Sequence, residues 1–142
     1  MDDARLHLNG WSFPRQHWGE SLHGETDQHS IIIELEWRRA GPADNTAKLF
    51  RHLEEGSLGS SNILVLQLFT EYYNLSRGGV SSKRKNAEFI GQKAAEASDR
   101  FEYSAVDFHL DPPKGDTDLP NGWKSSVRTV AESVDSAVEA YV

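Results

Sequence analysis

An apolar run between two polar stretches constrains the fold of this chain more than any other feature. Residues 62 to 69 read Asn-Ile-Leu-Val-Leu-Gln-Leu-Phe and follow a Gly-Ser-Ser stretch. A run of this length and composition is typical of a strand that is covered on both faces. We therefore expect it to lie in the middle of a sheet that helices cover.

The segments around this run alternate between predicted strands and predicted helices. Residues 28 to 37 are rich in β-branched side chains and predict a strand, and residues 5 to 23 indicate an irregular strand pair. Asp44 is a good N-cap for a short helix that ends at Gly56. The remaining expected elements are a helix from Ser81 or Ser82 to about Arg100 with Phe89, Ile90, Ala94 and Ala97 on one face, a strand with Val106, Phe108 and Leu110, and a helix from 123 to 141. This order predicts an α/β fold, a small mixed β-sheet flanked by helices, in a single domain of residues 1–142.

Composition excludes several classes of protein. No apolar run approaches the roughly 20 residues that a membrane-spanning helix needs, and the first residues do not resemble a secretory signal, so we expect a cytoplasmic protein without membrane contact. The chain has no cysteine, which excludes disulfides and thiolate ligands. Its net charge of -7 disfavours nucleic-acid binding through an overall positive surface, although a local basic groove is compatible with it.

Two glutamates interrupt the β-branched strand. Strand alternation places Glu34, Glu36 and Arg38 on one face, together with Ile32, while the flanking apolar residues point the other way. Carboxylates on one face repel each other, so such a pair either points into solvent on an edge strand or serves a function such as holding a cation. We favour the functional interpretation, because the surrounding run is strongly apolar.

Glu34-Leu35-Glu36 and the elements after it resemble the PD-(D/E)XK superfamily of restriction-endonuclease-like nucleases. In that family a β-hairpin carries an acid on its first strand and an acid-x-lysine on its second, followed by a helix and another strand. Here Glu36 stands where lysine is usual, as in some members of the superfamily. The resemblance covers about residues 11 to 70 and implies a restriction-endonuclease-like sheet.

The chain departs from the family pattern at two places. The Pro-Asp of the first strand has no counterpart, which leaves Glu20 or Asp27 as the upstream acid. We prefer Glu20, because a turn near residues 24 to 27 brings it close to Glu34. The missing lysine charge can come from the following helix, where Lys48 is the best substitute and Arg51 falls on the same face.

The resemblance implies hydrolysis of phosphodiester bonds in nucleic acid, with DNA as the expected partner. Glu20 and Glu34 would be ligands of Mg²⁺ or Mn²⁺, and Glu36 would be a further ligand or the base for the attacking water. Lys48 would stabilise the developing negative charge. We expect a homodimeric hydrolase. The alternative is a non-catalytic module of the same fold that binds nucleic acid or a protein partner.

Other groups of residues offer further candidates. Lys83, Arg84 and Lys85 form the basic run, and with Arg38 and Arg51 they are the expected contacts to nucleic acid. His17, His23 and His29 could hold a transition metal, although their spacing matches no metal motif known to us. Aromatic residues near the amino terminus are more typical of a core than of base stacking, and they are Trp11, Phe13 and Trp18.

Overall fold

A mixed sheet of four strands forms the centre of the protein. The computed structural model describes residues 5–8, 11–14, 21–25, 29–55, 62–115 and 117–141. The strands lie in the order β3 (Ser21–Glu25), β4 (His29–Glu36), β5 (Asn62–Phe69) and β6 (Phe101–Asp107), and a separate hairpin joins β1 (Arg5–Leu8) to β2 (Trp11–Pro14). β3 pairs antiparallel with β4, whereas β4, β5 and β6 are parallel.

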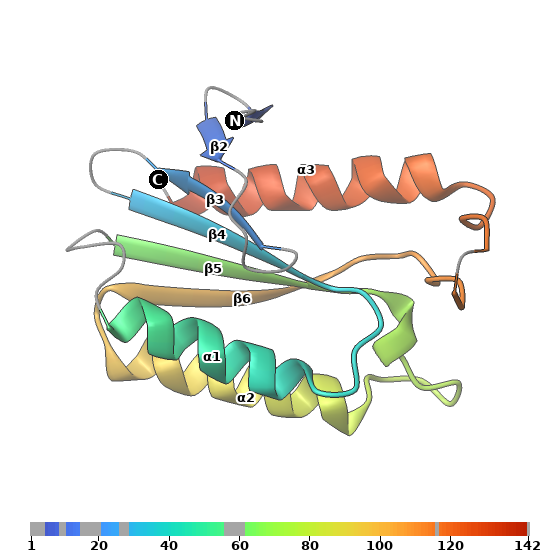
Figure 1. Cartoon of the computed structure of the whole chain (residues 1–142), viewed down its shortest axis with the longest axis horizontal. Helices are drawn as coiled ribbons and strands as arrows, with labels where there is room; N and C mark the ends of the chain where they lie inside the picture. Colours follow the sequence, from blue (N-terminus) through green and yellow to red (C-terminus); the bar gives the residue numbers. More distant parts are fainter. Residues whose placement is uncertain are drawn as a thin grey trace.

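Helices cover both faces of this sheet. α1 (Pro42–Glu54) and α2 (Ser82–Ala97) lie on one face, and α3 (Trp123–Tyr141) lies on the other (Figure 1). A short 3-10 helix, η1 (Glu71–Tyr73), follows β5. The predicted mixed α/β class is therefore confirmed, and so is the position of the run 62–69 in the interior of the sheet. Among the described residues, no helix combines the length and the apolar character that crossing a bilayer would need.

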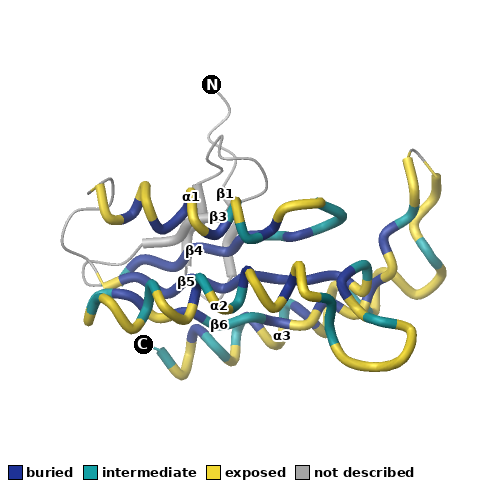
Figure 2. The backbone as a smooth tube through the Cα atoms, turned by 90° about the horizontal axis from the view of Figure 1, so that it is seen from below, coloured by how far each residue is buried: buried dark blue, intermediate teal, exposed yellow. Residues whose placement is uncertain are grey.

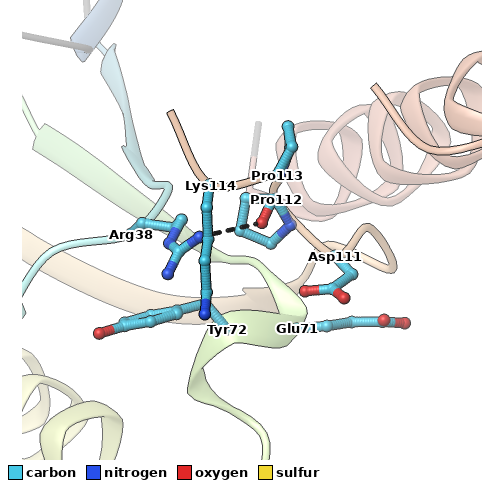
Figure 3. A pocket seen from close by; sticks show the side chains of 7 residues that line it. All are labelled: Arg38, Glu71, Tyr72, Asp111, Pro112, Pro113 and Lys114. Carbon is cyan, nitrogen blue, oxygen red and sulfur yellow. Dashed lines mark hydrogen bonds between the residues drawn. The ribbon is translucent and has the colours of Figure 1, made fainter. Parts of the chain in front are cut away.

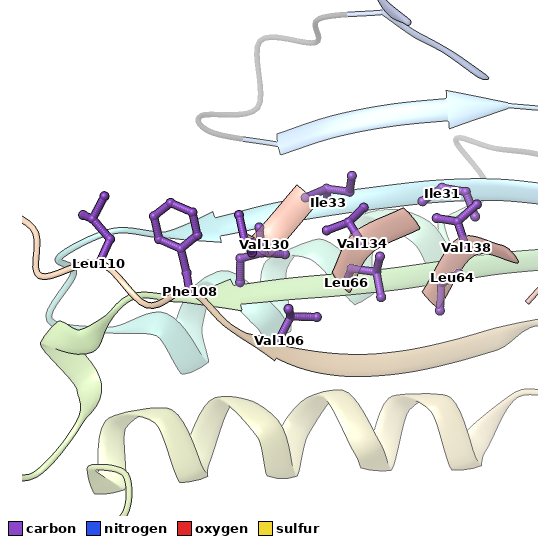
Figure 4. Close-up of a cluster of buried hydrophobic side chains, with 11 residues drawn as sticks. Ile31, Ile33, Leu64, Leu66, Val106, Phe108, Leu110, Val130, Val134 and Val138 are labelled. Atoms are coloured by element: carbon purple, nitrogen blue, oxygen red, sulfur yellow. The ribbon is translucent and has the colours of Figure 1, made fainter. Parts of the chain in front are cut away.

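Two apolar layers hold the helices to the sheet, because successive side chains of each strand point to opposite faces. β4 and β5 are buried over most of their length (Figure 2). The layer under α1 and α2 consists of Ile32, Leu49, Phe50, Leu53, Ile63, Val65, Phe101 and Tyr103. The layer under α3 consists of Ile31, Ile33, Leu64, Leu66, Leu68, Val106, Phe108, Leu110, Val130, Val134 and Val138 (Figure 4).

The first helix begins before the position that the sequence predicted. α1 starts at Pro42 with Gly41 as its N-cap, and Asp44 lies in its first turn. Proline suits the first helical position, because its fixed φ matches the helix and its missing N–H would have had no partner inside the helix. The N-cap prediction for Asp44 is therefore wrong, and its carboxylate pairs with Lys48 one turn later.

Phe89 and Ala97 of the predicted inner face of α2 are exposed, so the prediction is wrong for them, whereas Ala94 packs against the apolar layer beneath the helix. The buried residues of α2 are Arg84, Ala87 and Gly91, while Phe89 is 63% exposed. Gly91 lies directly against the ring of Tyr103 on β6, so that a Cβ atom at this position would overlap the ring carbons. Close packing of small residues, rather than large apolar ones, thus brings α2 onto the sheet.

The last strand ends earlier than expected. β6 stops at Asp107, and Phe108 and Leu110 follow it as buried residues of the loop. Their periodic spacing reflects burial against α3 and not continuation of the strand.

Candidate functional site

The glutamates of β4 are buried beneath α1. Glu34 is 7% exposed and Glu36 is fully buried, and both belong to the face of β4 that α1 and α2 cover. β4 lies between β3 and β5, where Glu34 is opposite Ser21 on one side and Gln67 on the other. The alternative of a solvated edge strand is therefore wrong, and the shared face is confirmed.

Side-chain amides from two elements bind the carboxylate of Glu36. Gln67 on β5 donates from Nε2 to Oε1 of Glu36 at 2.9 Å, and Asn45 on α1 donates from Nδ2 to Oε2 at 3.3 Å. Burying a carboxylate is unfavourable unless such donors replace the water that it loses. These amides stabilise Glu36 inside the fold and fix its orientation.

A chain of hydrogen bonds extends from Gln67 to the neighbouring elements. Its Nε2 also lies 2.9 Å from Oγ1 of Thr46, and its Oε1 accepts from the hydroxyl of Tyr103 at 2.6 Å. Thr46 in turn donates to the carbonyl of Pro42. Burial, followed by the negative charges of Glu88 and Glu36, raises the pKa of Tyr103, while Arg84 opposes this shift. The hydroxyl of Tyr103 therefore stays protonated and remains a donor.

Hydrogen bonds between backbone groups connect the ends of the parallel strands. Thr70 donates its N–H to the carbonyl of Glu36, and Phe108 donates to the carbonyl of Phe69. The N–H of Glu71 donates to the carbonyl of Leu110 at 3.0 Å. We call the residues that follow β4, β5 and β6 (37–39, 70–73 and 108–114) the rim.

Tyr73 fixes the part of the rim that follows β4. Its buried hydroxyl accepts from the N–H of Arg39 at 2.9 Å and donates to the Arg39 carbonyl at 3.2 Å. Burial raises the pKa of Tyr73 to about 12, the bond from Arg39 opposes the shift, and the charge of Glu36 adds to it.

The cations predicted from α1 do not approach the carboxylates. Lys48 is exposed and its Nζ lies 3.4 Å from the carboxylate of Asp44, and Arg51 is also exposed. The inner face of α1 instead carries Thr46, Leu49 and Phe50. The i, i+3 spacing of Lys48 and Arg51 therefore defines the solvent face of the helix, and the structure does not bring Lys48 to Glu36.

The three residues of the basic run at the start of α2 have different roles. Arg84 is buried, with Nη1 at 2.6 Å from Asp107, Nε at 3.2 Å from Glu88 and its guanidinium over the ring of Phe69. These ion pairs make Arg84 part of the core, so its prediction as a nucleic-acid contact is wrong. Lys83 and Lys85 are exposed and keep that prediction.

A pocket of about 570 Å³ lies at the rim. Arg38 follows β4, Tyr72 belongs to η1 after β5, and Lys114 lies in the loop after β6. Arg38, Tyr72 and Lys114 are drawn on one side of the pocket, and Glu71 and Asp111 on the other (Figure 3). Pro112 and Pro113 complete the lining.

Several predicted ligands lie outside the described residues. These ligands are Glu20, Asp27 and His17. For His23 only the backbone is described, and it lies opposite Ile32. His29 packs edge-on against Tyr141, with ring centroids 5.0 Å apart. Within residues 29–55, 62–115 and 117–141, no three His, Asp or Glu side chains form a group that could hold a metal ion.

Sequence reasoning missed Gln67, Asn45, Tyr72 and Lys114. Gln67 did carry a signal, because an amide inside an apolar strand needs a buried hydrogen-bond partner. Tyr72 and Lys114 carried none, since the topology brings their loops together over a long separation in sequence.

No protein-family model, curated protein or solved structure matches this chain.

Proposed function

We propose that the protein is a metal-dependent nuclease that hydrolyses phosphodiester bonds of DNA, with a restriction-endonuclease-like fold. The observation that carries this proposal is the burial of Glu34 and Glu36 on one face of β4. Repulsion between two buried carboxylates destabilises a fold, and such groups are concentrated at functional sites. The antiparallel hairpin β3–β4, followed by α1 and by the parallel strand β5, agrees with the element order of the PD-(D/E)XK resemblance.

The donor chemistry of this pair fits Mg²⁺ or Mn²⁺. Magnesium prefers oxygen ligands and is commonly bound through one or two carboxylates together with water and substrate phosphates. Glu34 and Glu36 would hold it, and Glu20 is the predicted third ligand. A bound divalent ion supplies the activation of water and the neutralisation of phosphate charge. Gln67 and Asn45 contribute by fixing the orientation of Glu36.

A non-catalytic module that binds nucleic acid is the second candidate. Both carboxylate oxygens of Glu36 accept hydrogen bonds from amides, which is typical of a structural carboxylate. Lys48, the predicted substitute for the family lysine, pairs with Asp44 on the solvent face. In this case Glu36 would organise α1, β4 and β5, and the rim alone would carry the function.

Metal-dependent thermal unfolding and DNA cleavage separate the two candidates. Mg²⁺ or Mn²⁺ at a hundredfold excess over its dissociation constant should stabilise the parent by roughly 2.7 kcal/mol, which raises the Tm by several degrees. Glu34→Gln should abolish both this shift and cleavage, yet be at least as stable as the parent without metal, because it removes charge repulsion at similar volume. Glu132→Gln on the exposed side of α3 is the matched control and should behave like the parent.

Two outcomes would reject the nuclease. One is a parent protein that shows neither a metal shift nor cleavage, and the other is a Glu34→Gln variant that retains both. DNA binding by such a protein would support the non-catalytic module.

A further inference from the structure

The pocket at the rim has the position and size of a ligand site. In sheets with parallel strands, ligands bind in crevices outside the carboxyl ends of the strands. Arg38, Tyr72 and Lys114 follow three parallel strands, so the pocket lies at this edge. Its volume of about 570 Å³ lies within the range of small-molecule sites.

One side of the pocket gathers positive charge around an aromatic ring. The guanidinium of Arg38 lies 5.0 Å from the centre of the Tyr72 ring, and its Nη1 donates to the Pro112 carbonyl at 3.4 Å. Lys83 does not line the pocket, but its Nζ lies 5.5 Å from the same ring centre and 3.5 Å from the Tyr72 hydroxyl. Lys114 lines the same pocket as Arg38 (Figure 3).

None of these cations is neutralised by a partner within the described part of the chain. Within residues 29–55, 62–115 and 117–141, no carboxylate lies within 4.0 Å of a charged nitrogen of Arg38, Lys83 or Lys114. Arg38 is oriented by a ring and a carbonyl instead. Cations held in this way favour a phosphate group, whose oxygens accept charge-assisted hydrogen bonds.

The other side of the pocket requires hydrogen-bond donors. Glu71 and Asp111 lie together there, and ionised carboxylates only accept hydrogen bonds (Figure 3). A ligand that fills both sides therefore combines an anionic group with hydroxyl or amino groups. A nucleotide unit of a DNA strand has this combination, since it carries a phosphate together with N–H groups on its base.

We propose that this pocket binds one nucleotide of a nucleic-acid strand, with the phosphate at Arg38 and Lys114 and donor groups facing Glu71 and Asp111. The inference rests on the proposed function, because it assigns the place where the strand meets the protein. It names a site separate from the buried carboxylates, so it can be tested without divalent metal.

Fluorescence anisotropy with a labelled single-stranded DNA oligonucleotide, in the presence of EDTA, provides the test. Arg38→Gln and Lys114→Gln should each weaken binding about tenfold, and the double variant should reduce the slope of log affinity against log salt by about 0.7. Lys93→Gln removes the same charge from an exposed position of α2 and should match the parent. A nucleoside monophosphate should displace the oligonucleotide at lower concentration than inorganic phosphate does.

Equal loss of affinity in Lys93→Gln and Arg38→Gln would overturn the proposal, because general charge would then explain binding. Equal competition by inorganic phosphate and the nucleoside monophosphate would also overturn it, since the acidic side would contribute nothing. If oligonucleotide binding depends on Arg38 and Lys114 but the protein shows no metal-dependent cleavage, this site is retained and the nuclease is rejected. If neither substitution changes DNA cleavage or oligonucleotide binding, the nuclease is retained and the site is rejected.

Discussion

Gln67 donates a hydrogen bond to Glu36 across the boundary between β5 and β4 and joins the carboxylate to the core beneath α1. Substitution of Gln67 by methionine keeps a similar volume but leaves Glu36 and the Tyr103 hydroxyl without this partner. We expect Gln67→Met to lower the free energy of unfolding by about 2–6 kcal/mol, since each lost partner of a buried polar group costs about 1–3 kcal/mol. Urea denaturation measures this change.

The same replacement at an exposed site provides the control. Gln92 lies on the solvent side of α2, so Gln92→Met should change the free energy of unfolding by about 0.5 kcal/mol or less. Similar values for the two variants would show that the bond to Glu36 contributes no stability.

Contact between Gly91 and the ring of Tyr103 leads to a second prediction. Alanine usually stabilises a helix by about 1 kcal/mol relative to glycine. Here its Cβ would overlap the ring, so Gly91→Ala should instead destabilise the protein by about 1–3 kcal/mol. Thermal and urea unfolding of Gly91→Ala, Tyr103→Leu and the double variant would show coupling, because the smaller leucine side chain relieves the overlap. Strict additivity of the two effects would contradict this explanation.

Tyr73 makes the free energy of unfolding depend on pH in the alkaline range. Its pKa in the folded protein is about 12, above the ordinary value of about 10, so the unfolded chain loses the phenolic proton first. The stabilisation by Tyr73 is complete below pH of about 10 and disappears as the pH rises to about 12. Urea unfolding across this interval should show a steeper loss of stability in the parent than in Tyr73→Phe, whose ring cannot ionise. Identical pH slopes would contradict the role of this hydroxyl.

Sequence patterns predicted the elements whose burial is uniform. β5 matches its predicted bounds, β4 differs by one residue at each end, and α3 begins and ends at Trp123 and Tyr141 as expected. In these segments the spacing of apolar residues directly reflects the layer that covers them. Strand alternation also predicted correctly that Glu34 and Glu36 share a face.

The sequence predicted less where contacts between distant segments decide the structure. α2 turns Phe89 outward because Ala87 and Gly91 permit a closer approach to the sheet, and helical spacing alone does not reveal that preference. Lys48 and Arg51 share a helix face, yet only the packing of α1 shows that the face meets solvent. The rim pocket combines three loops that no local pattern connects.

Backbone hydrogen bonds continue the pairing of the sheet beyond the ends of its strands, so this pairing within the rim does not depend on side chains. The N–H groups of Thr70, Glu71 and Phe108 donate to the carbonyls of Glu36, Leu110 and Phe69, and these bonds use no side chain. Lys114 is exposed and takes part in none of these bonds, so it can be exchanged while they are kept. For protein engineering, the exposed rim residues Glu71, Asp111 and Lys114 are positions at which ligand preference can be changed with little effect on the scaffold.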